Sequence, residues 1–214
     1  MASSSLVRLG GLAVVVAAVL LLTADIIDAY NIDAYTTAER NREFLTTATH
    51  AFQSALRMLT FVQVLPLGLV GLYARQSEAA GPLGLVGFVV AFAGTVLVSG
   101  FVWVDTFVAP ELAELASSAP QLMESGPPPG RALSFLVFGI GWALFGLASV
   151  VGRIYPRWAS ALLIIGAVIS TVVSLTLLPV PLGGLPFEGA VAWLGIALFT
   201  GWGGSASGQP SRVS

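Results

Sequence analysis

Six long apolar stretches take up most of the chain, and they restrict its possible folds more than any other feature. A helix needs ~20 mainly apolar residues to cross a hydrocarbon core of ~30 Å, because each residue adds 1.5 Å to its length. The sequence therefore predicts an all-α fold, a polytopic membrane helix bundle with six transmembrane helices. The predicted spans cover about residues 9–27, 54–74, 82–108, 132–151, 158–178 and 189–202, and the sixth is short and rich in glycine.

The balance of apolar and charged residues agrees with a membrane location. Of the 214 residues, 56% are hydrophobic and 9% are charged, whereas an ordinary soluble domain is ~25% charged. We expect one transmembrane domain over residues 1–204 and a disordered tail over residues 205–214. Arg8 before the first apolar stretch is also typical of a signal peptide, but no convincing small-x-small cleavage site follows, so we expect this helix to be retained.

Several residue types that carry chemistry are missing or rare. The chain has no Cys, which excludes disulfides, thiol nucleophiles, iron–sulfur clusters and cysteine zinc sites. All nine basic residues are Arg, so no Lys is present to form a Schiff base with retinal or pyridoxal phosphate. His50 is the single histidine, and the net charge of −2 gives no basic surface for nucleic acid. We therefore expect no cofactor, no metal site and no nucleic-acid partner.

The distribution of arginine predicts how the bundle is oriented. Cytoplasmic segments of membrane proteins carry an excess of positive residues close to the span ends. If the N-terminus is cytoplasmic, five arginines lie in cytoplasmic segments and three in outer loops. The first group is Arg8, Arg75, Arg153, Arg157 and Arg212, and the second is Arg40, Arg42 and Arg131. We therefore predict that both termini are cytoplasmic and that the protein lies in the inner, cytoplasmic membrane.

Local motifs predict how the first outer loop joins the second span. Thr36 and Glu39 have the spacing of a capping box, in which the hydroxyl and the carboxylate each bind a free backbone N–H group at a helix start. We expect the helix that begins here to continue past Phe44 into the second span. Pro66 lies inside that span, and it predicts a kink because its ring removes one helical hydrogen bond.

Polar residues follow one face of the second span and of the helix that leads into it. They are Thr46, His50, Gln53, Arg57 and Thr60, spaced four, three, four and three residues apart. This spacing places them on one side of a helix. An Arg that faces lipid in mid-membrane costs at least ~2.5–3.5 kcal/mol, so we expect this face to point into the bundle or toward water.

Charged residues on the first three spans are predicted to meet in the outer third of the membrane. Counted from the cytoplasmic ends, Asp25 lies ~24 Å along the first span, Arg57 ~26 Å along the second and Asp105 ~33 Å along the third. Asp28, at ~28 Å, is a second possible partner for Arg57, which leaves Asp105 near His50. The candidate ligand-binding residues are Asp25, Asp28, His50, Gln53, Arg57, Trp103 and Asp105, with Tyr30 and Tyr35 as further walls.

Two interpretations of this cluster are open. Arg57 with Asp25 or Asp28 can be a buried ion pair that fixes the register of two helices and has no further function. Alternatively, the cluster is a polar pocket open to the outside, because charged residues within a membrane usually have a function. His50 alone is weaker support, since a histidine at a helix start is more often a satisfied polar residue than a ligand or a base.

Several short segments at the helix ends carry a family resemblance. They are GLYARQ (71–76) with GLVGF (84–88), FVAP (107–110), and YPRWA (155–159) with LLIIG (162–166). Together they resemble an uncharacterised family of small six-pass bacterial integral membrane proteins. The resemblance covers spans two to five, implies the multi-pass topology and implies no activity.

Three functions are compatible with these features. The chain has no recognisable catalytic motif, and its small size and plain second half favour an accessory or structural subunit of a larger membrane complex. Its partners would be membrane lipids and other membrane protein subunits. The first alternative is a binding or transport protein whose pocket takes a small polar or amphipathic molecule. The second is a membrane-embedded acid–base enzyme acting on a lipid or isoprenoid, because paired carboxyl groups permit such chemistry without specifying it.

Overall fold

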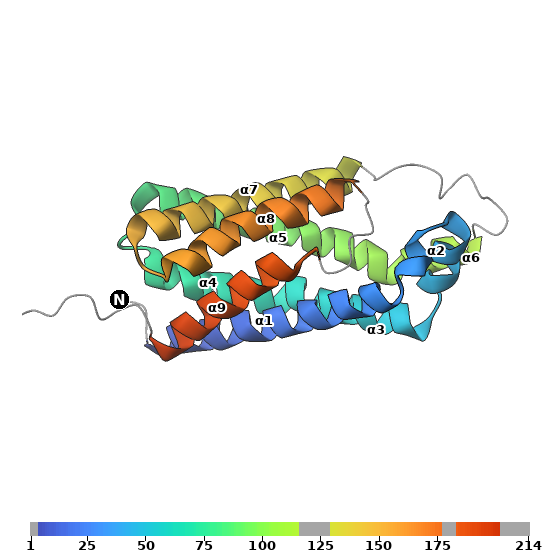
Figure 1. Cartoon of the computed structure of the whole chain (residues 1–214), viewed down its shortest axis with the longest axis horizontal. Coiled ribbons are helices and arrows are strands. Elements are labelled where there is room, and N and C mark those ends of the chain that lie inside the picture. The colour runs from blue at the N-terminus through green and yellow to red at the C-terminus, as the bar shows by residue number, and fades with distance from the viewer. Residues whose placement is uncertain (1–3, 116–128, 177–182, 202–214) are drawn as a thin grey trace, which may run out of the picture.

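The computed structural model describes residues 4–115, 129–176 and 183–201, and within these ranges every regular element is helical (Figure 1). The elements are α1 (Ser4–Tyr30), the 3₁₀ helix η1 (Ile32–Tyr35), α2 (Ala38–Leu45), α3 (Ala48–Leu59), the π-helical turn η2 (Thr60–Val64), α4 (Leu65–Gln76), α5 (Gly81–Phe107), α6 (Ala109–Leu115), α7 (Pro129–Gly152), α8 (Arg157–Thr176) and α9 (Leu185–Thr200). The predicted all-helical bundle is therefore confirmed. The predicted tail at 205–214 and the predicted span ends at 177–178 and 202 lie outside the described residues.

Five helices are long and apolar enough to cross a membrane. They are Ser5–Tyr30, Ala48–Gln76, Gly81–Phe107, Pro129–Gly152 and Arg157–Thr176. The sixth apolar helix, α9, has 16 residues and a length of ~24 Å, which is less than the ~30 Å of a hydrocarbon core. By the length and composition of these five helices, the chain is a multi-pass membrane protein, and the sixth crossing stays a prediction.

The long helices form a closed ring. Going around it, α1 packs against α9, α9 against α8, α8 against α7, α7 against α5, and α5 against the combined helix of α3, η2 and α4, which returns to α1. The short helices α2 and α6 lie together at one end of the bundle, which we call the α2/α6 end (Figure 1). The N-terminus of α1 lies at the opposite end (Figure 1).

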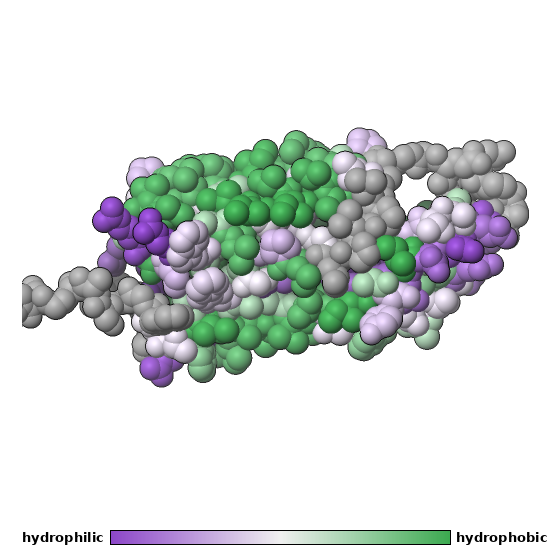
Figure 2. Space-filling model, in the orientation of Figure 1, coloured by the Kyte–Doolittle hydropathy of each residue, from purple (hydrophilic) through white to green (hydrophobic). Residues whose placement is uncertain are grey.

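The surface of the ring is apolar between the two ends. On the face shown in Figure 2, hydrophobic side chains cover the middle of the bundle and hydrophilic residues gather at both ends. On α5, for example, Leu85 and Val89 have about half of their surface exposed. Large contiguous apolar surfaces are rare on soluble monomers, so this belt fits contact with lipid.

The interior toward the opposite end is filled with large side chains. Trp142, Phe145, Leu69, Leu163 and Leu194, from four different helices, are fully buried there. Glycines allow the helices to approach this closely, since interfaces in membranes depend on small residues. In the crossing of α5 with α7, a Cβ atom added to Gly94 would lie 2.4 Å from the Cα atom of Phe138.

The connection between α2 and α3 differs from the predicted continuous helix. Thr37, not Thr36, caps α2 by accepting a hydrogen bond from the Arg40 N–H group at 3.2 Å, so the predicted capping box is wrong by one residue. α2 then ends at Leu45, and Thr47 starts a new helix by accepting a hydrogen bond from the His50 N–H group at 3.1 Å. Thr46 belongs to this break and is therefore not on the polar face of α3.

The predicted disturbance at Pro66 takes the form of a π-helical turn. The Leu65 N–H group donates to the carbonyl of Thr60, five residues back, directly before Pro66. A π-turn adds one residue to the helix at the point where a proline ring would collide with the preceding turn. The Ser99 hydroxyl of α5 donates to the Phe61 carbonyl in this turn at 2.8 Å, which satisfies an acceptor that the irregular turn leaves available.

Candidate functional site: a charged cavity within the ring

A cavity of about 490 Å³ occupies the interior of the ring toward the α2/α6 end. Its lining comes from α1, η1, α2, α3, α5, α7, α8 and α9, together with η2 and the residues before α9. The charged or titratable side chains in the lining include Asp25, Asp28, His50, Arg57, Asp105, Arg131 and Glu188. The volume lies within the range of ~300–1,000 Å³ that is usual for small-molecule sites.

Arg57 joins α3 to α1 through two carboxylates. Its Nη2 atom donates to Asp28 Oδ2 and lies 3.3 Å from Asp25 Oδ1. Asp25 and Asp28 are three residues apart, so both project from the same side of α1 toward Arg57. The Arg57 charge is therefore neutralised within the protein.

Asp28 is held by two further hydrogen bonds that leave it little freedom. Tyr35 O–H and Gln53 N–H both donate to Asp28 Oδ1. Gln53 also donates to the Ala24 carbonyl at 3.3 Å and has no exposed surface. Burial and the Asp28 carboxylate raise the pKa of the Tyr35 hydroxyl, which therefore stays a donor at neutral pH. This half of the cluster is a rigid structural anchor.

Glu188 is a charged residue of the site that the sequence prediction missed. It lies in the first turn of α9 with 5% of its surface exposed, and its Oε2 atom has no hydrogen-bond partner among the described residues. Its other oxygen interacts with Asp25: a Cβ atom added to Gly184 would lie 2.5 Å from Asp25 Oδ2 and 2.9 Å from Glu188 Oε1. The carboxyl groups of Asp25 and Glu188 therefore lie close to each other beside Gly184.

His50 and Asp105 form a second polar pair on the other side of the cavity. The His50 Nε2 atom lies 3.7 Å from Asp105 Oδ2, and its Nδ1 atom has no hydrogen-bond partner among the described residues. The imidazole is almost fully buried and meets the Phe44 ring edge-on at 5.5 Å. The sequence also predicted that these two residues lie close together.

Arg131 was predicted in a loop, but the structure places it in the first turn of α7 as part of the lining. Its guanidinium lies over the rings of Phe101 and Phe135, 5.1 and 5.9 Å from their centres. No ion pair of Arg131 within 4 Å is found in the described part of the chain, although its charge interacts with Asp105 at longer range. Two aromatic rings thus hold this cation by cation–π attraction.

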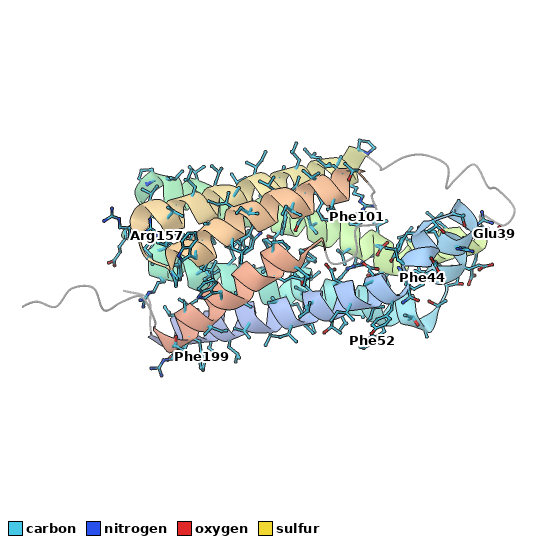
Figure 3. All side chains as sticks on the ribbon, viewed as in Figure 1. Glu39, Phe44, Phe52, Phe101, Arg157 and Phe199 are labelled. Atoms are coloured by element: carbon cyan, nitrogen blue, oxygen red, sulfur yellow. The ribbon has the colours of Figure 1, made fainter. Side chains whose placement is uncertain are left out.

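The aromatic walls differ from the predicted ones. Trp103 is half exposed and packs against Phe107 with ring centres 5.7 Å apart, so it does not line the cavity, and Tyr30 is exposed as well. Tyr35 does line it. The remaining aromatic lining is made of phenylalanines, namely Phe44, Phe61, Phe101, Phe135, Phe138 and Phe187; Figure 3 shows Phe44 and Phe101 in the half of the molecule toward the α2/α6 end.

The site thus combines an apolar wall with an excess of acidic groups. Asp25, Asp28, His50, Arg57 and Asp105 line the cavity as the sequence analysis expected, and Gln53 lies behind them as a hydrogen-bond partner. In the described ranges, no three His, Cys, Asp or Glu side chains are grouped so that they could hold a metal ion. The site therefore offers carboxyl, guanidinium and imidazole groups together with aromatic rings around a cavity.

Comparison with known proteins gives no further guide to the site. No protein-family model, no curated protein and no solved structure matches the chain. The resemblance to small six-pass bacterial membrane proteins stays a prediction.

Proposed function

We propose that the chain is a membrane-embedded binding protein whose cavity takes a small molecule. The observation that carries this proposal is the cavity of about 490 Å³, lined by charged side chains that do not all neutralise one another. A structural ion pair accounts for Arg57 with Asp25 and Asp28, but it does not account for Glu188 or Arg131. Buried polar atoms usually have partners, so unpartnered ones around a cavity favour a ligand.

The proposed topology has six spans with both termini in the cytoplasm, α9 being the sixth. Arg8, Arg75, Arg153 and Arg157 lie at the end opposite α2 and α6. Five acidic residues, Asp33, Glu39, Glu43, Glu111 and Glu114, lie at the α2/α6 end. The excess of arginine supports a cytoplasmic location for the opposite end. The cavity would then be reached from the outer side of a bacterial inner membrane.

Native mass spectrometry of the protein, extracted gently from its own membrane, tests this function. We expect a bound small molecule that is lost in Ser174→Phe, whose ring fills the cavity, and kept in Val172→Phe, whose side chain points outward on the same helix. Ligand loss only in the first variant supports binding. An empty protein that arrives with a stoichiometric protein partner overturns the proposal and favours the accessory-subunit role.

One observation favours a second function, the membrane-embedded acid–base enzyme. Asp25 and Glu188 meet in a cavity whose lining also includes the apolar rings of Phe138 and Phe187, and there one carboxyl can donate a proton and the other accept one. A lipid or isoprenoid recovered chemically altered after incubation with the protein would support this function. The alteration must be absent in Glu188→Gln.

A further inference from the structure

The charges around the cavity do not cancel. Four carboxyl groups, Asp25, Asp28, Asp105 and Glu188, face two guanidinium groups, Arg57 and Arg131, and one imidazole. Arg57 is taken up by Asp25 and Asp28, and Arg131 lies on two phenylalanine rings. An anionic ligand would therefore meet an excess of negative charge, and the guanidinium group that has no ion pair among the described residues, Arg131, already lies on two aromatic rings. A cationic ligand would offset this excess of negative charge.

Glu188 is the carboxyl group that is most clearly available to bind a cation. It is more than nine-tenths buried, it lines the cavity, and its Oε2 atom lacks a partner among the described residues. Asp25 lies beside its other oxygen and is shared with Arg57. Two adjacent carboxyl groups in a site of low polarity do not both ionise without a compensating positive charge. The empty site then holds a proton, and a cation can replace it.

Aromatic rings that share the cavity lining with Glu188 favour an organic cation over a metal ion. Phe138 lies 5.3 Å from Phe187 and 5.9 Å from Phe61 between ring centres, and all three line the cavity. Aromatic faces attract ammonium groups, and the protein already uses this attraction for Arg131. A hard metal ion is instead held by several oxygen ligands, and the described ranges contain no group of three or more His, Cys, Asp or Glu side chains that could hold a metal ion.

We infer that the cavity binds a small monovalent organic cation, an ammonium group with apolar substituents, with Glu188 as its counter-ion and the rings of Phe61, Phe138 and Phe187 around it. This inference rests on the proposed binding function and names its ligand class. The cavity volume of about 490 Å³ accommodates a substituted ammonium ion. Binding displaces a proton from the carboxyl pair, so the affinity falls as the pH is lowered.

The groups that face Glu188 support this pH dependence. They are Asp25 from α1 and, through Asp25, Arg57 from α3. From α8, the polar side chains in the lining are Ser170 and Ser174, which do not titrate near neutral pH. Protons and the ammonium ion therefore compete for the same carboxyl oxygens. Asp28 on α1, which Arg57 also binds, interacts with Asp25 and is a further titratable group of this cluster.

Isothermal titration calorimetry of the full chain in lipid nanodiscs tests the inference with three matched probes. They are benzyltrimethylammonium, its uncharged carbon isostere neopentylbenzene, and phenylacetate. We expect the cation to bind at least about tenfold more tightly than either of the others. Repeating the titration in buffers of different ionisation enthalpy should reveal proton release with the cation alone.

Two charge variants locate the counter-ion. Glu188→Gln should weaken cation binding by roughly 30-fold or more, because it removes a buried charge that faces the ligand. Glu39→Gln makes the same change on an exposed residue of α2, outside the cavity (Figure 3), and should leave the affinity unchanged. Glu188→Asp keeps the charge and should keep proton release, which covers the case that Glu188→Gln does not fold.

The possible failures are distinguishable. If neopentylbenzene or phenylacetate binds as tightly as the cation and Ser174→Phe abolishes that binding, the cavity is a binding site but the organic-cation inference is overturned. If cation binding is equal in Glu188→Gln, Glu188→Asp and the unchanged protein, Glu188 is not the counter-ion. If no probe binds and native mass spectrometry finds the cavity empty, the proposed binding function fails as well.

Discussion

The two halves of the ring differ in how they treat buried polar groups. Toward the opposite end, the buried polar groups are neutral. Ser149 donates to Gln76 Oε1 at 2.7 Å, and Tyr155 donates to the Leu72 carbonyl at 2.8 Å, while Gln76 Nε2 and Ser160 Oγ have no hydrogen-bond partner among the described residues. Toward the α2/α6 end, the polar groups are charged and surround a cavity. Neutral groups that find partners stabilise a packed bundle, whereas charged groups around open volume are a sign of function.

The largest effect should come from breaking the structural anchor of the cavity half. Arg57→Met leaves Asp25 and Asp28 without their cation, so we expect a loss of about 3 kcal/mol in the free energy of unfolding. SDS titration followed by circular dichroism measures it. Arg57→Met with Asp28→Asn should recover part of the loss, because fewer uncompensated charges remain. An unchanged midpoint in Arg57→Met would show that the ion pair is not an anchor.

Overfilling the packed half should have the next largest effect. Gly87→Leu forces α5 away from the backbone of Phe145 in α7, and we expect a loss of about 2–3 kcal/mol by the same titration. Gly100→Leu is the matched control on α5, since no atom lies within 4 Å of a Cβ atom added there. Equal stability of the two variants would contradict the close crossing of α5 and α7.

A smaller effect should follow from one hydrogen bond of the packed half. Tyr155→Phe removes the bond to Leu72 and should cost about 1 kcal/mol. Burial raises the pKa of Tyr155 above its usual value of 10.0, so the folded protein keeps a proton that the unfolded chain loses at high pH. Stability should therefore fall as the pH rises above about 10. The fall should be shallower in Tyr155→Phe, and identical pH profiles would contradict the buried hydroxyl.

The smallest expected change in stability is that of Glu188→Gln, and it separates the structural anchor from the other charged residues of the cavity. Glu188→Gln removes a charge that lacks a full set of partners, so we expect no loss of stability, or a gain of about 0.5 kcal/mol. Arg57→Met, in the same cavity, should behave in the opposite way. A loss from Glu188→Gln as large as that from Arg57→Met would assign both residues to the structural anchor.

The sequence predicted the helices well because an apolar run that is long enough to cross a membrane has few structures open to it other than a helix. It also predicted the approach of Arg57 to Asp25 and Asp28, because depth along a helix follows directly from residue number. It placed Arg131 and Glu188 in loops for a related reason. A charged residue at the end of an apolar run lowers the hydropathy there, so the predicted spans began at 132 and 189, just after each of them.

Other differences come from contacts that local patterns do not contain. Thr36 and Thr37 are both suitable caps, and the Thr36 hydroxyl instead donates to the Asp33 carbonyl in the preceding turn. The position of Trp103 was predictable in principle. Val98, Val102 and Asp105 follow the helical period on the inward face of α5, and Trp103 falls outside that set. We predicted Trp103 in the cavity wall because it is aromatic, although its position in the helical period does not place it on the inward face of α5.

The π-turn of Thr60–Val64 sets the rotational phase between the two halves of one span. In an α-helix each residue advances the side chain by ~100°. The inward residues before the turn are Gln53, Arg57 and Thr60, and those after it are Leu65, Leu69 and Leu72. In an uninterrupted helix these two sets would face directions about 120° apart. The single extra residue of the turn rotates the second set back by nearly that angle. Deleting one residue of Thr60–Val64 would therefore give a regular helix with Arg57 and Leu69 still on the same inward side, whereas an unbroken helix of unchanged length would turn Arg57 out of the cavity while Leu69 stays in the core.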